Sequence, residues 1–158
     1  MARMDTRLES EGAEFLVLGH LLINRIAAYK TYTNMAGYDL IATNAEENTS
    51  ARIQVKSRWG TGFTGFPINN FDCDFVVAAF LNRGSKDGKR KLMSPDFFVF
   101  PTQMILDLPR TAGWGKIELK NIGDLEGYRE KWSLIREFLN PSAADSHHST
   151  TTSPRITR

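Results

Sequence analysis

Three polar side chains on neighbouring apolar segments have the types needed for metal-assisted hydrolysis of a phosphodiester. Asp39 opens one segment, and Gln54 and Lys56 lie in the next, where they alternate with Ile53 and Val55. Carboxylate and amide oxygens are hard ligands of the kind that Mg²⁺ and Mn²⁺ prefer. An ammonium group beside them can hold a phosphate oxygen or orient an attacking water. The alternative interpretation is structural: Asp39 ends a strand at a turn, and Gln54 and Lys56 line a solvated face.

A short hairpin would bring these groups together. Two apolar-rich segments (37–42 and 51–57) are joined by a polar run that is too short for a crossover helix. Such segments, bounded by turn formers, predict two antiparallel strands. Alternation directs Gln54 and Lys56 to the same face of the second strand. If the far ends of the strands lie level, Asp39 is within reach of both side chains.

A fourth polar side chain, Glu14, lies in the first predicted helix, at residues 6–25. Apolar residues at helical spacing predict its buried face, namely Leu8, Phe15, Leu18, Leu22 and Ile26. Glu14 shares a stripe with Leu18, so we expect it to project from the flank of that face toward the sheet. A carboxylate there is costly unless a metal or a base pairs with it. The alternative is a surface position for Glu14 near Arg7 or Arg25.

The order and spacing of these four residues resemble those of the PD-(D/E)XK nuclease superfamily. The resemblance rests on Glu14 in the first helix, Asp39, and the Gln54-x-Lys56 pair that follows. More narrowly, the pattern is similar to the branch that contains Holliday-junction resolvases and Mrr-type restriction nucleases, some of which have Gln in the third acidic position. The resemblance covers about residues 11–81, roughly half of the chain.

The resemblance implies an α/β fold with a restriction-endonuclease-like core, in which an N-terminal and a C-terminal helix flank a mixed central sheet. It also implies a metal-dependent endonuclease that hydrolyses DNA phosphodiester bonds. Glu14, Asp39, Gln54 and the backbone carbonyl of Val55 would then hold Mg²⁺ or Mn²⁺. Lys56 would be the catalytic lysine of the same site, acting with Glu14, Asp39 and Gln54.

Two positions depart from the family pattern. Tyr38 stands where the family has Pro, which removes a turn constraint but no chemistry. Gln54 replaces an acid and so removes one negative charge, which is worth on the order of 4 kcal/mol for unit charges about 4 Å apart at an effective dielectric near 20. We therefore expect weak Mg²⁺ binding until a substrate phosphate completes the shell. The alternative function is a catalytically inactive nucleic-acid-binding module on the same fold, and a protein–protein adaptor is a third hypothesis.

The loop after the second strand, at residues 57–70, combines three glycines with three aromatic residues. Glycines let a backbone bend close to a ligand, Trp59 and Phe63 can stack on bases, and Arg58 can meet a phosphate. The structural alternative is a connection whose aromatic rings tuck under the core. A later turn stretch, at residues 82–91, carries several basic residues that would hold a DNA backbone if the turn lies beside the site.

Apolar runs and turn signals predict the remaining elements. They are strands at 26–32, 71–81 (buried on both faces), 97–100 and 116–119, a short helix at 101–108, and a last helix at 125–139. The core stripe of the last helix is predicted to contain Leu125, Tyr128, Trp132, Ile135 and Leu139, with Asp124 as the cap. Residues 1–140 would form one nuclease-like domain, followed by a disordered tail at 141–158.

Composition is compatible with this hypothesis without demanding it. The 158 residues suit a single domain, and the net charge of +2 permits binding to a polyanion. A single cysteine, Cys73, cannot form an internal disulfide, so we expect a cytoplasmic protein. No apolar run is long enough to span a bilayer, so we expect no membrane partner. The resemblance implies DNA as the partner. A homodimer would be the simplest arrangement for cutting both strands of a duplex.

Overall fold

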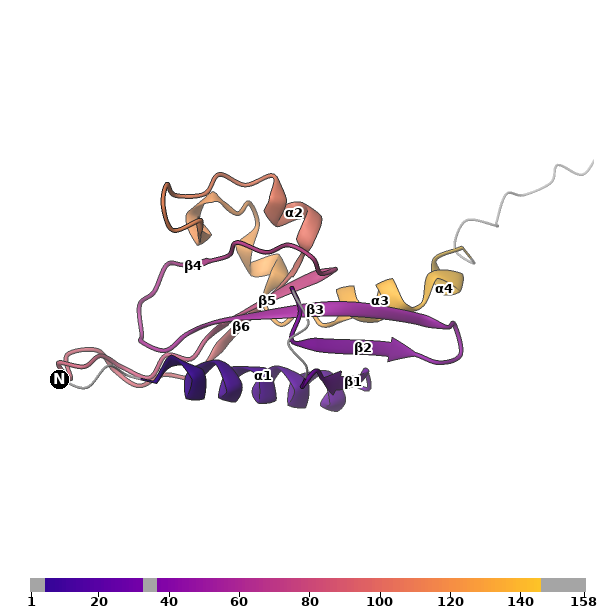
Figure 1. Ribbon diagram of the computed structural model, residues 1–158, viewed down its shortest axis with the longest axis horizontal. Coiled ribbons are helices and arrows are strands. Elements are labelled where there is room, and N and C mark those ends of the chain that lie inside the picture. The colour runs from indigo at the N-terminus through magenta and orange to yellow at the C-terminus, as the bar shows by residue number, and fades with distance from the viewer. Residues whose placement is uncertain (1–4, 33–36, 146–158) are drawn as a thin grey trace, which may run out of the picture.

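Within the described residues, 5–32 and 37–145, the computed structural model forms a five-stranded mixed sheet (Figure 1). The strands lie in the order β1 (Ala27–Lys30), β2 (Leu40–Asn44), β3 (Thr49–Arg58), β5 (Phe75–Phe80) and β6 (Asp96–Pro101). Strands β3 and β5 run parallel, and the other neighbouring pairs are antiparallel. The predicted hairpin is therefore confirmed, and the predicted strands follow in the predicted order, but the structure adds a short strand inside the segment 57–70 that was predicted to be a loop.

The other elements cover the two faces of this sheet. One face packs against α1 (Thr6–Ile23) and α3 (Ser133–Leu139). The opposite face packs against α2 (Thr102–Leu106), the small separate sheet of β4 (Gly65–Pro67) and β7 (Lys116–Glu118), and the short helices η1 (Leu119–Asn121) and η2 (Leu125–Tyr128). Helix α4 (Pro141–Asp145) follows α3. Figure 1 shows α1 on one side of the sheet and α2 with β4 on the other.

Strand β5 is buried along its whole length because both faces of the sheet are covered at this position. Alternation divides its side chains between the two cores. Phe75 and Val77 join the core under α1, whereas Val76 and Phe80 join the core under α2 and β4. The continuous apolar run thus predicted this strand correctly.

The buried face of α1 differs from the predicted face. Ala13, Val17 and Leu21 are fully buried, whereas Phe15 and Leu22 are about half exposed. Leu8 is also exposed, and of the predicted set Leu18 packs partly against the core while Ile26 is buried just beyond the helix. The smaller side chains at four-residue spacing let the helix approach the sheet closely, so the prediction from the largest apolar residues was wrong. Glu14 lies beside this face, as predicted.

The last predicted helix is broken into two pieces on opposite sides of the sheet. Asp124 and Glu130 both have positive φ angles, of 50° and 46°, and Asp124 forms no capping hydrogen bond through its side chain. Between the pieces the N–H of Glu130 donates to the Phe97 carbonyl of β6 at 2.8 Å. The chain therefore crosses the sheet edge here. Of the predicted stripe, Leu125 and Tyr128 pack against the core under α2 and β4, whereas Trp132, Ile135 and Leu139 join the core under α1.

Two further predictions concern the chain end and membranes. Pro141–Asp145 forms the short helix α4, so the predicted tail at 141–158 begins with a helical turn, and residues 146–158 lie outside the described residues. The sequence also predicts a turn at 34–37 before Asp39, and residues 33–36 lie outside the described residues. Within the described ranges, every helix is too short or too polar to cross a lipid bilayer.

Candidate functional site

Asp39 lies just before β2, where the chain enters the sheet between β1 and β3. Its N–H donates to the Ile53 carbonyl at 2.9 Å, and its carbonyl accepts from the Thr31 N–H at 2.9 Å. Its carboxylate accepts a hydrogen bond from the Val55 N–H at 2.7 Å. Continuing the β2–β3 register by one residue places Asp39 opposite Gln54. The Asp39 carboxylate therefore accepts a hydrogen bond from the β3 backbone that a strand carbonyl would otherwise accept. This bond fixes the Asp39 side chain at the end of β2, beside Gln54.

Gln54 brings an unusual polar atom to the middle of the sheet. Its side chain is 7 % exposed, and its Oε1 atom is buried with no hydrogen-bond partner among the described residues. Its neighbour in the parallel register is Val76, whose side chain belongs to the core under α2 and β4. Because buried polar groups are almost always hydrogen-bonded, an orphaned amide oxygen on the residue opposite Asp39 marks a place that suits a cation.

Glu14 is paired with a base that the sequence analysis did not single out. Its carboxylate contacts the ammonium of Lys30 on β1, which also lies 3.2 Å from Glu11. The Lys30 side chain is 6 % exposed and the Glu14 side chain 16 % exposed. Burial raises the pKa of Glu14, and repulsion from Asp39 raises it further, although the Lys30 hydrogen bond opposes both. Glu14 thus experiences the charge of Asp39 but is paired with Lys30, and its helix packs on the face of the sheet opposite to the one that Gln54 shares with Val76.

Lys30 is enclosed from several sides. Burial works against its charge, but the hydrogen bonds to Glu14 and Glu11 outweigh that effect and raise the pKa of Lys30. Its ammonium also lies 5.4 Å from the centre of the Phe15 ring and 5.6 Å from that of Tyr32. The only sequence signal for this role was a lysine among apolar residues in a predicted strand. The alternative of a surface position for Glu14 near Arg7 or Arg25 is therefore wrong.

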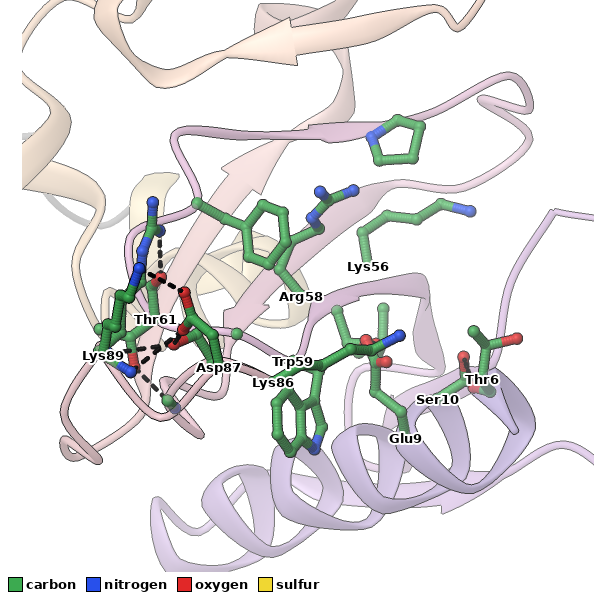
Figure 2. Close-up of a pocket in the computed structure, with 18 residues that line it drawn as sticks. Thr6, Glu9, Ser10, Lys56, Arg58, Trp59, Thr61, Lys86, Asp87 and Lys89 are labelled. Carbon is green, nitrogen blue, oxygen red and sulfur yellow. Dashed lines mark hydrogen bonds and ion pairs between the residues drawn. The ribbon is translucent and has the colours of Figure 1, made fainter. Parts of the chain in front are cut away.

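A groove of about 1050 Å³ runs past the end of β3, between α1 and the loops that follow β3 and β5 (Figure 2). The predicted residues that line it are Val55, Lys56, Arg58, Trp59 and Phe63. Glu14, Asp39 and Gln54 are not part of its lining. Asp39 is nevertheless hydrogen-bonded to Val55, which does line the groove. The basic turn after β5 also lines the groove, through Lys86, Lys89 and Arg90, so this turn and Lys56 border the same groove.

The two loops that border the groove are joined at Thr61. Its N–H donates to the Gly84 carbonyl at 2.8 Å, and its hydroxyl donates to the Lys91 carbonyl at 2.7 Å. The Arg90 guanidinium donates to the Thr61 carbonyl at 2.5 Å and packs over Gly62, whose φ of +88° and lack of a side chain leave room for it. Sequence analysis missed Thr61 because its partners are about 23 to 30 residues away. These bonds fix the groove's width at that end.

The side chains near Asp39 offer oxygen donors for a metal ion. Among residues 5–32 and 37–145, no three His, Cys, Asp or Glu side chains gather closely enough to hold a metal ion by themselves. The donors near Asp39 are instead of two kinds, a carboxylate and the amide oxygen of Gln54, which is neutral where a second carboxylate would carry a charge. All are oxygen atoms, and the Gln54 oxygen has no hydrogen-bond partner in the part of the chain that the structure describes. The set therefore fits Mg²⁺ or Mn²⁺ in chemical type, with one charge fewer than an all-acid set.

Comparison with known proteins identifies the fold. No protein-family model matches the chain, and no curated protein matches it. The bacterial homing endonuclease I-Ssp6803I is similar in structure, with 23% identity over 93% of this chain and 100% of that chain and a TM-score of 0.58. The Holliday junction resolvase Hjc of Archaeoglobus fulgidus matches with 21% identity over 71% of this chain and 85% of that chain, with a TM-score of 0.45. The first similarity confirms the predicted α/β fold, a mixed central sheet with flanking helices that this chain shares with a nuclease.

Proposed function

We propose that this protein is a metal-dependent endonuclease that hydrolyses DNA phosphodiester bonds. One observation carries the proposal. The fixed carboxylate of Asp39 lies opposite Gln54, whose oxygen is orphaned, and the two residues that follow Gln54 on β3, Val55 and Lys56, line a cationic groove. A shared fold with a homing endonuclease supports DNA as the substrate class. The exposed cations of the groove give a polyanion a place to bind.

Mg²⁺ or Mn²⁺ would be held by Asp39, the Gln54 oxygen, the Val55 carbonyl and Glu14. Such an ion, when bound, supplies Lewis-acid polarisation of the scissile phosphate. Asp39 is suited to its part because the Val55 N–H fixes one of its carboxylate oxygens. Glu14 is suited because Lys30 balances its charge beside Asp39, which would otherwise repel it.

Lys56 would stabilise the negative charge that develops on the phosphate, or orient the attacking water. Its ammonium projects into the groove on the same side of β3 as Arg58 (Figure 2). A fixed cation aimed at developing charge is worth about 10²- to 10³-fold in rate when a single such group is removed. The groove would thereby hold the backbone, and Lys56 would act at the bond to be cut.

Cleavage assays with Lys56→Ala test the proposal. Purified protein would be incubated with linear, circular and branched DNA in the presence of Mg²⁺, Mn²⁺ or a chelator. We expect cleavage by the parent with either metal, and a loss of about 10²-fold or more in Lys56→Ala. Lys131→Ala is the matched control, because Lys131 is an exposed lysine just before α3, outside the groove lining and the basic turn. Equal cleavage by the parent and Lys56→Ala would refute the assignment of Lys56.

A catalytically inactive nucleic-acid-binding module is the second candidate, and the amide at Gln54 favours it. Gln54→Glu separates the two functions. Tighter Mg²⁺ binding with retained or increased cleavage supports the nuclease. Salt-dependent DNA binding without cleavage by either protein supports the module. Because cutting both strands of a duplex is simplest with two copies, we also propose a homodimer, which sedimentation of the DNA complex would detect.

A further inference from the structure

The ring of Phe63 is in contact with a cation. The central carbon of the Arg58 guanidinium lies 3.8 Å from the centre of the Phe63 ring. The ring edge also packs closely against Gly60, where an added Cβ would lie 2.9 Å from a ring carbon. Phe63 as a whole residue is still 41 % exposed. One face of Phe63 is therefore covered by Arg58, and that face is closed to a nucleic acid base.

Arg58 differs from the other arginine of the groove in what its guanidinium contacts. Arg90 donates to the Thr61 carbonyl and fills the space over Gly62, so it joins two loops. Within the described part of the chain, Arg58 has no carboxylate or carbonyl partner and rests only on the Phe63 ring. A guanidinium stacked on a ring keeps its N–H donors free at its edge, where a phosphate can accept two of them.

We propose that Phe63 is a positioning residue, which holds the Arg58 guanidinium in the groove so that it contacts a nucleic acid phosphate near Lys56. The proposal deepens the proposed function and rests on it. It also replaces the expectation that Phe63 itself stacks on a base. Arg58 follows Lys56 by two residues on the same side of β3, so the two cations would contact the same stretch of backbone.

The physical reason is pre-organisation. A free arginine side chain loses rotamer freedom when it binds a phosphate, and that loss weakens binding. Stacking on Phe63 restricts the Arg58 side chain before the substrate arrives. Trp59 does not share this role, because it turns toward α1 (Figure 2), where it lines a second hollow together with Leu8 and Leu16.

Salt dependence separates positioning of Arg58 from stacking on a base. Binding of a short blunt DNA duplex would be measured by fluorescence anisotropy in chelator, so that no cleavage occurs, over a series of KCl concentrations. Each lost phosphate contact reduces the slope of log K against log salt by about 0.9, or about threefold to fourfold in affinity change over a fourfold rise in salt. We expect this reduction in Arg58→Met, in Phe63→Leu and, without further loss, in the double variant.

Two controls keep the test independent of folding and of long-range charge. Phe63→Tyr keeps the ring and should keep the slope of the parent. Lys131→Gln removes a positive charge just before α3, outside both the groove lining and the basic turn, and should also leave the slope nearly unchanged. Thermal unfolding of each variant would be measured alongside, and a normal transition in Phe63→Leu makes its slope interpretable.

The outcomes are distinct. A Phe63→Leu variant that binds more weakly with the parent's slope, and whose effect adds to that of Arg58→Met, would overturn the proposal in favour of base stacking. If Phe63→Leu does not fold, Phe63→Met provides the same comparison. A parent protein that binds no DNA at low salt would overturn both this proposal and the proposed function, whereas an unchanged slope in Phe63→Leu would overturn this one alone.

Discussion

Gln54→Met should stabilise the protein while weakening its response to divalent metal. The Gln54 side chain is 7 % exposed, and its Oε1 atom is buried without a partner in the described residues. A buried polar group without a hydrogen bond costs about 1–3 kcal/mol. Met fills a similar volume and brings no such oxygen. We expect the free energy of unfolding to rise by about 1–2 kcal/mol. The gain is smaller than the full penalty because the substitution also removes the amide nitrogen, which is not an orphaned atom and whose favourable interactions are lost.

Urea unfolding and thermal unfolding would measure this gain. In a domain of this size each kcal/mol shifts Tm by about 2–4 °C, so the variant should melt about 2–8 °C higher without metal. The same measurements at saturating Mg²⁺ test the second half of the prediction. A bound ion stabilises the parent by about 2.7 kcal/mol at a hundred times its Kd, and the variant should gain much less. The difference between the two proteins should therefore shrink or reverse in Mg²⁺.

Gln54→Glu is the matched comparison, because it places a charge at the same buried position. It should be less stable than the parent without metal and should gain more from Mg²⁺. The reasoning is refuted if Gln54→Met is less stable than the parent in the absence of metal. It is refuted equally if Gln54→Met keeps the parent's full stabilisation by Mg²⁺, since the oxygen would then play no part in holding the ion.

Two further predictions concern buried groups elsewhere in the fold. Lys30→Met should lower the free energy of unfolding at neutral pH by about 1–3 kcal/mol, because Glu14 and Glu11 lose a largely buried cation. The fold raises the pKa of Lys30, so its contribution to stability is present below the ordinary lysine pKa of about 10.4 and is lost as the pH rises through the raised pKa. Urea titrations in which Lys30→Met shows the same loss of stability at strongly alkaline pH would contradict this. Burial raises the pKa of the Cys73 thiol, which lies 3.3 Å from the Thr102 hydroxyl, so a disulfide reagent should modify it only after unfolding. Rapid modification of the native protein would show that this strand end opens.

The sequence by itself determined the elements whose signals are local. Alternation around Gln54 and Lys56 predicted β3, and the continuous apolar run predicted β5, because a strand's burial pattern follows directly from its two faces. The short polar connection predicted the β2–β3 hairpin, and the hairpin register brings Asp39 level with Gln54. The candidate metal donors on the sheet were accessible to sequence analysis for that reason.

Only the tertiary structure decided which partners distant residues acquire. Lys30 pairs with Glu14 because β1 lies beside α1, and Thr61 joins two loops through partners far along the chain. The sequence around Glu130 continues a helical pattern, yet its N–H bonds to β6 and the helix breaks there. Helical periodicity specifies which side chains share a face, but it does not specify which face the sheet will bury. Contacts between distant segments make that choice, because the free energy of packing outweighs weak local preferences.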